Sequence, residues 1–403
     1  MSPQFAVRGS TFEVRNAKFA VRSSQVQPTP NLEPRTASSE LRAAGRDLRV
    51  AIVHDWLTGM RGGEKVLDAI CELYPQATIF TLVRVPGSVS ARIERHPIRT
   101  SAIQWLPRAA ELYRHYLPLF PAAIEWFDLD GFDLVISSSH CAAKAVVRPG
   151  HARHLCYCHS PMRYAWDQFP AYFGPEQVGR LRHRLLRPIM ARLARWDAAT
   201  ADRVDRFLAN SQYVAGRIRR YYNRGSTVVH PPVDTDFYRP GAQRHPNEDP
   251  GFVVVSALVP YKRVDVAIEA CRLARAKLTI VGRGPEEPRL RQLAGPDVSF
   301  LGWRTDEEIR DLYRTATAVL LPGVEDFGMV PVEAQSCGAP VVALGEGGAR
   351  ETVIDGETGV LVEAPSPAAF AVPLPPAEPP SATKIPPKVL FVPACPGLPP
   401  PPA

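Results

Sequence analysis

The sequence lacks the signatures of several classes of protein. No apolar run approaches the ~18 residues of a membrane-spanning helix, and the N-terminus has no apolar segment of the kind found in secretory signals. The seven cysteines are scattered and form no paired Cys-x-x-Cys motif, so we expect no zinc site. Because disulfides are rare in a reducing compartment, an odd number of scattered cysteines favours a cytoplasmic protein.

The sequence also has fewer acidic than basic residues. The chain has 41 Asp and Glu against 48 Lys and Arg, which gives a net charge of +7. A positive surplus favours anionic partners such as a nucleotide or a phospholipid surface, although arginines also simply solvate helix faces. Nucleic-acid binding would need aromatic side chains interleaved with clustered basic ones. Residues 180–206 are rich in arginine without that interleaving, so we expect no nucleic-acid partner.

The 403 residues are enough for two domains, each with its own core. We expect residues 1–47 to be a disordered leader or a wrongly extended start, because FAVR, FEVR and FAVR recur there without enough apolar residues to build a core. An organelle transit peptide is an alternative for this segment. Many of the 42 prolines fall in residues 364–403, which we expect to be a disordered tail because proline density forbids helices.

Residues 48–230 and 251–363 each alternate short apolar runs with helical patterns. This alternation predicts an α/β protein with a parallel, doubly wound sheet in each of two domains. The polar, proline-flanked residues 231–250 are expected to link them. The expected strands are Leu48–His54, Thr78–Leu82, Leu134–Ser138, Leu155–His159, Arg206–Ala209, Thr227–His230, Phe252–Ser256, Leu278–Val281, Val298–Leu301, Ala318–Leu321 and Val341–Leu344.

Two histidines fall at the carboxyl ends of expected strands. His140 comes shortly after the strand that ends at Ser138, and His159 closes the next strand. In open α/β sheets, ligands bind at this edge. A lone histidine is more often structural than catalytic, but two at one edge favour a functional role.

An arginine-rich segment, residues 174–206, has helical spacing. Its apolar residues are expected to share one face of a helix: Leu181, Leu185, Ile189, Leu193 and Trp196. We expect this face to pack on the core, with contact to an anionic membrane surface as the alternative. Pro188 predicts a break into two helices.

The stretch Gly323–Gly338, reading GVEDFGMVPVEAQSCG, follows a buried-strand pattern. Pro331 and Gly338 predict the start and end of a short helix, which places Glu325 on the preceding loop and Glu333 in the first turn. A helix N-terminus suits a diphosphate. The two carboxylates could accept hydrogen bonds from the hydroxyls of a sugar and a ribose, or could merely cap the helix.

A second glycine-rich turn follows the first expected strand. Gly59, Gly62 and Gly63 lie between that strand and a helical pattern. Such a turn presents backbone N–H groups to an anion, although a simple tight turn would use the same residues. The spacing is neither GxGxxG nor a phosphate-binding P-loop.

These segments together resemble the retaining glycosyltransferases of family four, which have the two-domain GT-B fold. The resemblance covers roughly residues 48–363. The motifs that carry it are the E-x7-E pair Glu325 and Glu333, SALVPYKRVD, ANSQYV, PPVDTDFY, VGRGP and DGETG. HDWLTGMRGGEKVL and HSPMRYAWD resemble the mannosyltransferase-like branch of that family.

The resemblance implies two Rossmann-like doubly wound domains that face a cleft, with the nucleotide-sugar donor held mainly by the second domain and the acceptor by the first. Glu325 would bind the donor sugar, Lys262 the diphosphate and Glu333 the ribose. His159 would lie at the reacting sugar. The further donor-binding residues that the resemblance implies are Gly62, Gly63, Arg263, Arg283, Trp303, Phe327, Gly328 and Met329.

The chain departs from the family pattern in two places. Ala257 stands where many members carry an arginine, which leaves Lys262 with less help unless Arg61 or Arg283 takes that place. After Glu363 the pattern is lost, which favours a truncated or frame-shifted chain and puts closure of the cleft and turnover in doubt.

The expected function is transfer of a hexose, with mannose from GDP-mannose as the specific expectation, to a glycan or lipid-linked acceptor. Retention of configuration and a role in cell-surface polysaccharide or glycolipid synthesis follow from the resemblance, with peripheral contact at the inner face of the membrane. No cofactor and no metal are expected, because the DxD letters at Asp128–Asp130 and Asp234–Asp236 fall in a turn and in the linker. An inactive donor-binding remnant and a sugar-nucleotide epimerase are the alternatives.

Overall fold

The computed structural model of the protein describes residues 48–241 and 251–371. Three segments with a sequence-based expectation therefore lie outside the described residues. They are the leader 1–47 with its FAVR repeat, residues 242–250 of the expected linker, and residues 372–403 of the expected tail. In the described part of the chain, no helix combines the length and apolar character needed to cross a membrane.

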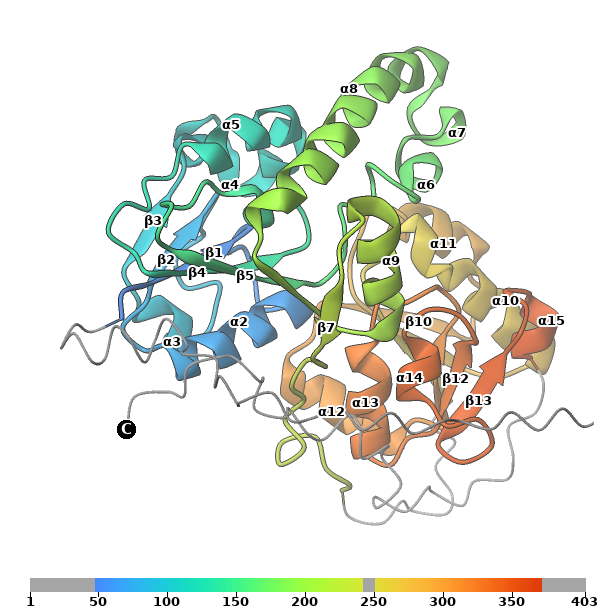
Figure 1. The fold of residues 1–403 in the computed structure, drawn as a ribbon. Helices are drawn as coiled ribbons and strands as arrows, with labels where there is room; N and C mark the ends of the chain where they lie inside the picture. The colour runs from blue at the N-terminus through green and yellow to red at the C-terminus, as the bar shows by residue number, and fades with distance from the viewer. Residues whose placement is uncertain (1–47, 242–250, 372–403) are drawn as a thin grey trace, which may run out of the picture.

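Two parallel sheets form the centres of the two domains (Figure 1). The first has the order β3-β2-β1-β4-β5-β6-β7 and the second β10-β9-β8-β11-β12-β13. The first contains β1 (Val50–His54), β2 (Thr78–Thr81), β3 (Ile98–Thr100), β4 (Leu134–Ser139), β5 (Arg153–Cys158), β6 (Arg206–Ala209) and β7 (Ser226–Val228). The second contains β8 (Phe252–Val255), β9 (Leu278–Val281), β10 (Val298–Gly302), β11 (Ala318–Leu321), β12 (Val341–Leu344) and β13 (Gly359–Val362).

Helices cover both faces of each sheet. Those of the first domain are α2 (Gly62–Leu73), α3 (Ala91–Glu94), α4 (Ala109–Leu112), α5 (Phe120–Glu125), α6 (Phe169–Phe173), α7 (Pro175–Val178), α8 (Arg180–Ala199) and α9 (Gln212–Tyr222). Those of the second are α10 (Val264–Ala274), α11 (Glu287–Leu293), α12 (Asp306–Thr315), α13 (Met329–Ser336), α14 (Ala349–Thr352) and α15 (Pro367–Phe370). Short 3-10 turns lie at Ala102–Trp105, Tyr113–Leu119, Ala143–Ala145, Thr200–Arg203 and Pro260–Lys262.

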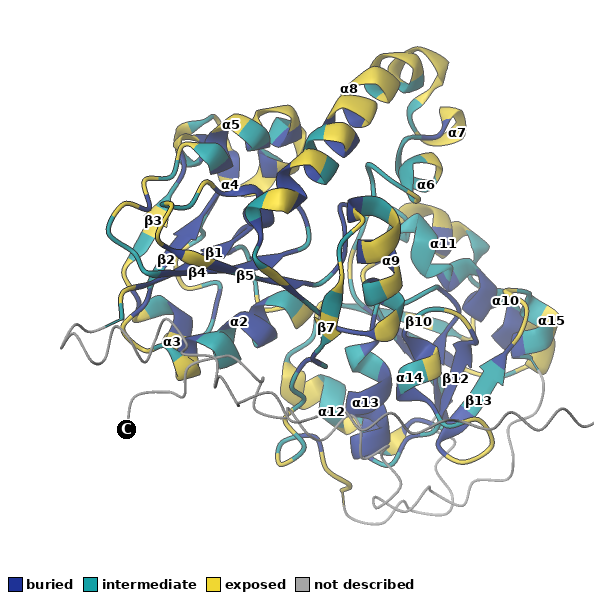
Figure 2. Ribbon diagram, viewed as in Figure 1, coloured by how far each residue is buried: buried dark blue, intermediate teal, exposed yellow. Residues whose placement is uncertain are grey.

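The strand orders confirm the predicted α/β fold with two doubly wound, Rossmann-like sheets. Each order reverses once, between β1 and β4 in the first sheet and between β8 and β11 in the second. Central strands such as β1 and β11 are buried along their whole length, which explains their continuous apolar sequences. Figure 2 shows the buried sheets between helices whose outer faces are exposed. Ligands of such folds bind at these reversals, outside the carboxyl ends of the strands.

The sequence patterns did not predict two edge strands, β3 and β13. β3 has three residues, none of them fully buried, so it carries no apolar run. β13 follows the Asp355–Gly356 turn, and two of its four residues are buried. Both strands lie at an edge of the described sheets, with a neighbour on one side only. They are recognised as strands by their hydrogen bonds to that neighbour and not by an apolar sequence.

The prediction of a disordered chain immediately after Glu363 is wrong for residues 364–371. One helical turn, α15, forms there and buries Phe370 in the same apolar cluster as residues of α10. Ser366 caps this turn by accepting a hydrogen bond from the Ala369 N–H, and Pro367 occupies the first helical position. Proline is tolerated at that position because its missing N–H would have had no partner within the helix.

Two predictions for the arginine-rich segment are also wrong. Helix α8 runs without a break from Arg180 to Ala199, with Pro188 inside it. Pro188 is exposed, so its ring projects into solvent and the helix loses one backbone hydrogen bond without a break. The expected apolar face does not pack on the core over its length, because Leu181, Leu185 and Ile189 are exposed.

Candidate active site

The N-termini of two helices from different domains meet at the facing edges of the two sheets. A Cβ atom placed on Gly62, at the start of α2, would lie 3.0 Å from the Met329 Sδ atom at the start of α13. A Cβ on Gly63 would lie 3.8 Å from His159 Nε2. The structure therefore brings together four of the residues expected from the sequence. Unpaired N–H groups at two helix N-termini make this a favourable place for an anion.

Lys262 and Glu325 form an ion pair at the reversal of the second sheet. The Lys262 Nζ atom contacts both carboxylate oxygens of Glu325, and each side chain is 16% exposed. Burial alone would lower the pKa of Lys262, but Glu325 raises it, so the lysine stays charged. Gly323 makes the pairing possible, since a Cβ there would lie 2.5 Å from the Tyr261 carbonyl oxygen. Because residue 323 has no side chain, the loop after β11 can lie directly against the backbone of Tyr261 and Lys262.

Glu333 is 6% exposed and is bound by a lysine of the other domain. The Lys65 Nζ atom lies 3.0 Å from Glu333 Oε1 and 3.2 Å from Asp306 Oδ2, and it donates a hydrogen bond to the Tyr238 hydroxyl at 3.1 Å. Burial would lower the pKa of Lys65, but these neighbours raise it well above its usual range. Sequence reasoning missed Lys65, although it follows Gly62, Gly63 and Glu64 directly.

The predicted position of Glu333 within its helix needs a correction. Helix α13 begins at Met329, two residues before the expected start at Pro331, so Glu333 lies in the second turn and not the first. Pro331 is then the third helical residue. That position still lies in the first turn, where a backbone N–H has no acceptor within the helix, so proline is tolerated there. Gly338 follows the helix with a φ of +88°, which agrees with its expected role as the stop.

A chain of polar contacts leads to His159 at the reversal of the first sheet. The Ser138 hydroxyl on β4 lies 3.1 Å from His54 Nδ1 and 2.9 Å from His159 Nε2. The other nitrogen of His54 lies 3.8 Å from a carboxylate oxygen of Glu64. Burial, followed by the nearby histidines, lowers the pKa of His159 to about 3, so its imidazole is neutral at physiological pH. Burial alone would raise the pKa of Glu64, but His54 beside it lowers it.

His140, the other histidine expected at this edge, packs against Asp55. Its Nδ1 atom lies 3.2 Å from Asp55 Oδ2, and burial lowers the pKa of its ring. The Asp55 carboxylate also accepts hydrogen bonds from four successive backbone N–H groups, those of residues 140–143. Asp55 therefore fixes the loop after β4, and His140 belongs to that fixed loop.

Arg163 is a second cation beside the Lys262 pair that sequence reasoning did not single out. Its guanidinium group pairs with Asp326 across the domain boundary and lies 4.8 Å from the centre of the Tyr261 ring. Lys262 Nζ lies 5.3 Å from the same ring centre. Arg163 is part of the HSPMRYAWD segment, so a motif pointed to its neighbourhood. Its charge lies close enough to the Lys262–Glu325 pair to affect the pKa of Lys262, which it lowers.

The remaining expected donor-binding residues lie farther from this centre or turn away. Arg263 has a φ of +51° and pairs with Asp265 at 3.2 Å. Arg283 is exposed, and a Cβ on Gly302 would lie 3.5 Å from its Nε atom, which places it beside the loop that carries Trp303. Trp303 itself is 65% exposed.

Two further expected donor-binding residues can offer only their backbone groups to a ligand. The Phe327 side chain is buried in a small apolar cluster, so its N–H rather than its ring is the group available to a ligand. Gly328 has a φ of +90°, a conformation that favours glycine and directs the chain into α13. Arg61, named as a possible replacement for the missing arginine, is exposed at the start of α2.

Other contacts hold the two domains together beside the site. The Ser211 hydroxyl donates to the Asp326 carbonyl oxygen at 2.5 Å. The Glu351 carboxylate accepts hydrogen bonds from the backbone N–H groups of Gln212 and Tyr213. Among residues 48–241 and 251–371, no group of three or more His, Cys, Asp and Glu side chains is placed to hold a metal ion.

Comparison with known families matches nearly all of the described chain. Residues 60–237 match the family described as Glycosyltransferase Family 4. Residues 239–373 match the family described as Glycosyl transferases group 1. The two matches meet within residues 231–250, the expected linker.

Curated relatives include the D-inositol 3-phosphate glycosyltransferases of Mycobacteroides abscessus and Mycolicibacterium smegmatis. The first is 33% identical over 183 residues, which are 40% of this chain and 41% of the relative. The second is 31% identical over 187 residues, 40% of this chain and 42% of the relative. The matching segment thus spans about two fifths of the length of these relatives.

Solved structures of similar fold include Anabaena HepE in complex with UDP and glucose, with a TM-score of 0.57 and 20% identity over 81% of this chain and 88% of that chain. Sucrose-phosphate synthase from Thermosynechococcus elongatus has a TM-score of 0.56 and 19% identity over 81% and 89% of the two chains. At this level of identity, these likenesses show the shared fold.

Proposed function

Because the chain belongs to the glycosyltransferases of GT-B type, we propose that it transfers a hexose from a nucleotide sugar to a glycan or lipid-linked acceptor with retention of configuration and without a metal. The observation that carries this proposal is the convergence of the Lys262–Glu325 pair with the N-termini of α2 and α13. These groups come from both domains, as a site between donor and acceptor requires.

The leaving diphosphate explains why positive groups gather here. Glycosyl transfer passes through an oxocarbenium-like state while negative charge grows on the leaving group. Fixed positive groups stabilise that charge. A helix N-terminus contributes about 0.3–2 kcal/mol, whereas a hydrogen bond from a charged group such as Lys262 contributes about 1.5–3 kcal/mol. Lys262 is therefore the principal group for the diphosphate, with Arg163 beside it.

The carboxylates suit the hydroxyl groups of the donor. Ionised carboxylates only accept hydrogen bonds, and hydroxyls donate them. We assign Glu325 to the sugar because it lies with Lys262 at the end of β11, and Glu333 to the ribose because it lies deeper, on α13. The neutral imidazole of His159, which lies beside Gly63, faces the reacting sugar in this proposal.

GDP-mannose is the donor that we propose first, supported by the resemblance of HDWLTGMRGGEKVL and HSPMRYAWD to mannosyltransferase-like sequences. UDP-glucose is the second candidate, because structures of Anabaena HepE, which shares the fold, contain UDP and UDP-glucose. Cell-surface polysaccharide or glycolipid synthesis at the inner face of the membrane is the proposed setting.

A thermal-shift screen of the full chain against nucleotide sugars tests the proposal. GDP-mannose should raise the Tm of the wild-type protein, and EDTA should leave turnover unchanged. Lys262→Ala should lower kcat/KM by about tenfold or more while the protein stays folded, since loss of about 1.5–3 kcal/mol corresponds to that range. Arg289→Ala is the matched control, because Arg289 pairs with Glu286 on the exposed face of α11.

Each alternative has its own outcome in this experiment. Stabilisation without turnover would indicate a donor-binding remnant, and conversion of the donor without an acceptor would indicate an epimerase. Near-normal activity of Lys262→Ala would remove the assignment of the diphosphate site. If no nucleotide sugar raises the Tm, the proposed function is wrong.

A further inference from the structure

An apolar stripe lies on the solvent-facing side of α8. Leu181, Leu185 and Ile189 are spaced four residues apart, so they lie within about 80° of one another around the helix axis. They are 74%, 61% and 38% exposed. Met190 and Leu193 are buried. They lie about 140° and 80° around the helix axis from the centre of this stripe. Figure 2 shows the exposed outer surface of α8.

Arginines surround this stripe. Around the helix axis, Arg192 projects between Leu181 and Leu185, Arg182 lies about 20° beyond Ile189, and Arg184 lies about 60° to the other side. All the arginines of α8 are exposed: Arg180, Arg182, Arg184, Arg187, Arg192 and Arg195. In the part of the chain that the structure describes, no ion pair involves any of them. No Asp or Glu occurs between Arg180 and Trp196, so the charge of this surface is uncompensated on its own helix.

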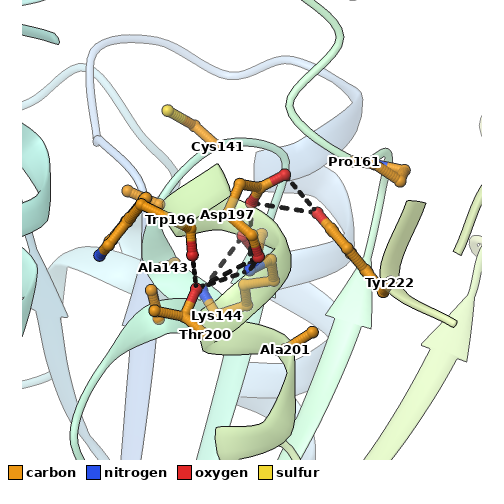
Figure 3. Close-up of polar contacts among 12 residues, drawn as sticks. Cys141, Ala143, Lys144, Pro161, Trp196, Asp197, Thr200, Ala201 and Tyr222 are labelled. Atoms are coloured by element: carbon orange, nitrogen blue, oxygen red, sulfur yellow. Dashed lines mark hydrogen bonds and ion pairs between the residues drawn. The ribbon is translucent and has the colours of Figure 1, made fainter. Parts of the chain in front are cut away.

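A buried polar cluster fastens the other end of α8 to the first sheet (Figure 3). Asp197 is fully buried, lies 3.0 Å from Lys144 Nζ, and accepts hydrogen bonds from the Trp166 indole and the Tyr222 hydroxyl. Lys144 also donates to the Thr200 hydroxyl. Because the C-terminal end is fixed in this way, the N-terminal half projects from the first domain as a preformed helix (Figure 1).

We propose that the N-terminal half of α8 is a docking surface for an anionic lipid bilayer. Leucine and isoleucine side chains can enter the boundary between headgroups and acyl chains while flanking arginines contact lipid phosphates. A second copy of this chain is a poorer occupant, because pairing two such helices would bring their unpaired guanidinium groups together. The charge of the surface therefore selects an anionic bilayer.

The docking surface is connected to the candidate active site through α6. The His183 ring at the start of α8 contacts the Phe173 carbonyl oxygen at 2.7 Å, and the neighbouring Tyr172 ring lies 6.0 Å from that of Tyr261, next to Lys262. Docking through α8 would therefore bring the site close to a lipid-linked acceptor. This last step rests on the proposed function, whereas lipid docking itself does not.

Flotation of the full chain with lipid vesicles tests the proposal without donor or acceptor. The protein should float with phosphatidylcholine vesicles that contain phosphatidylglycerol and not with phosphatidylcholine alone, and added salt should weaken the binding. The triple variant Leu181→Ser/Leu185→Ser/Ile189→Ser should lose binding by about tenfold or more, because three bilayer-inserted side chains are removed. Arg182→Gln/Arg184→Gln/Arg192→Gln should abolish the preference for anionic vesicles.

Matched controls use exposed residues elsewhere in the molecule. Leu73→Ser/Leu273→Ser changes exposed leucines of α2 and α10, and Arg289→Gln/Arg291→Gln changes exposed arginines of α11. These variants should bind vesicles as the wild type does, and all variants should keep the wild-type Tm, since the substituted side chains are exposed.

The proposal is overturned if the α8 leucine variant floats like the wild type, or if the wild type does not bind anionic vesicles. It is also overturned if the wild type is a dimer that the leucine variant converts to a monomer while neither binds lipid, which would make this surface a contact between two copies. None of these outcomes depends on nucleotide-sugar binding, so this experiment and the thermal-shift screen test the two proposals independently.

Discussion

The Ser138 hydroxyl lies between the imidazole rings of His54 and His159. Because a hydroxyl has one proton to donate, the direction of its hydrogen bonds is coupled to the tautomers of the two rings. The Glu64 carboxylate favours a proton on the His54 nitrogen that faces it, so His54 Nδ1 accepts a hydrogen bond from the Ser138 hydroxyl. The Ser138 oxygen then accepts from the Nε2–H group of His159. This order fixes the tautomer and the orientation of His159, which makes Ser138 a positioning residue.

Ser138→Ala should therefore lower kcat by about tenfold, as is common when a group that orients a functional histidine is lost, and should leave the donor KM nearly unchanged. The pH dependence of kcat should change as well, because the His159 ring loses its partner. Ser137→Ala is the control, since the Ser137 hydroxyl, on the preceding residue of β4, contacts His154 at 2.8 Å and not His159. Equal kcat values for the two variants would rule out a positioning role for Ser138.

A second prediction at this scale concerns His154, whose pKa burial lowers from the ordinary 6.5 to about 4. Above pH 6.5 the ring is neutral in both states. Between pH 6.5 and 4 the unfolded chain binds a proton there and the folded protein does not, so stability should fall as the pH falls through this window, by roughly 3 kcal/mol for a shift of this size. Below about pH 4 this loss is complete.

Thermal unfolding measured across that range checks the prediction. His154→Asn should show a smaller fall in Tm between pH 6.5 and 4, because the titrating ring is gone while the amide can still donate to the Arg203 carbonyl oxygen that lies near His154 Nδ1. If the Tm curves of the wild type and the variant run parallel over the whole window, His154 does not carry the effect.

At the scale of the element, the backbone N–H groups at the start of helix α9 donate hydrogen bonds to acceptors from both domains. Ser211 caps the helix by accepting from the Val214 N–H at 3.0 Å. The N–H groups of Gln212 and Tyr213 have no acceptor within the helix. They donate to Glu351, which comes from α14 of the second domain. The negative charge at a helix N-terminus adds a favourable interaction with the helix dipole. One carboxylate thus stabilises a helix and a domain contact together.

Glu351→Gln should destabilise the protein by about 1–2 kcal/mol, because an amide provides one acceptor and no charge. Looser contact between the domains should also raise the donor KM. Glu346→Gln, in the loop that precedes α14, is the control because Glu346 is exposed. Denaturant unfolding and donor titration measure the two effects, and the prediction fails if both variants match the wild type.

Lys65 links the two domains of the molecule. Its ammonium group joins α2 of the first domain to Glu333 of α13 and Asp306 of α12 in the second domain, and to Tyr238 of the linker. Glu333 is the carboxylate that we assign to the ribose, so a bound nucleotide would meet a carboxylate already engaged by the other domain. The contact between the domains and the proposed recognition of the ribose therefore share Glu333.

Lys65→Ala should open the cleft and increase the radius of gyration measured by small-angle scattering without donor. Loss of hydrogen bonds from a charged group should also reduce stability by about 1.5–3 kcal/mol. Arg289→Ala, which removes a pair within α11, should leave the radius of gyration unchanged. A Lys65→Ala protein as compact as the wild type would show that other contacts between the domains are sufficient for closure.

Much of this molecule could be predicted from the sequence because the signals are local. Continuous apolar runs such as Ala318–Leu321 need no partner to be recognised as buried parallel strands. Residues directly after such strands lie at the ligand edge of any doubly wound sheet, which is why His159 and Glu325 could be placed there. Where the local signal is weak, as in β3, or where a proline has an unusual place, as in α8 and α13, the sequence prediction was incomplete or wrong.

The sequence by itself determined that there are two parallel sheets, eleven of the thirteen described strands, and the residues at their ends, because these follow from hydrophobic periodicity and turn chemistry. Only the tertiary structure decided which charges meet. Lys65 and Glu333 are 268 residues apart in the chain, and Arg163 and Asp326 are 163 apart, so no local pattern pairs them. The exposure of the N-terminal half of α8 was also decided by the tertiary structure. An amphipathic pattern predicts which residues share a face, but it does not predict along how much of the helix other elements cover that face.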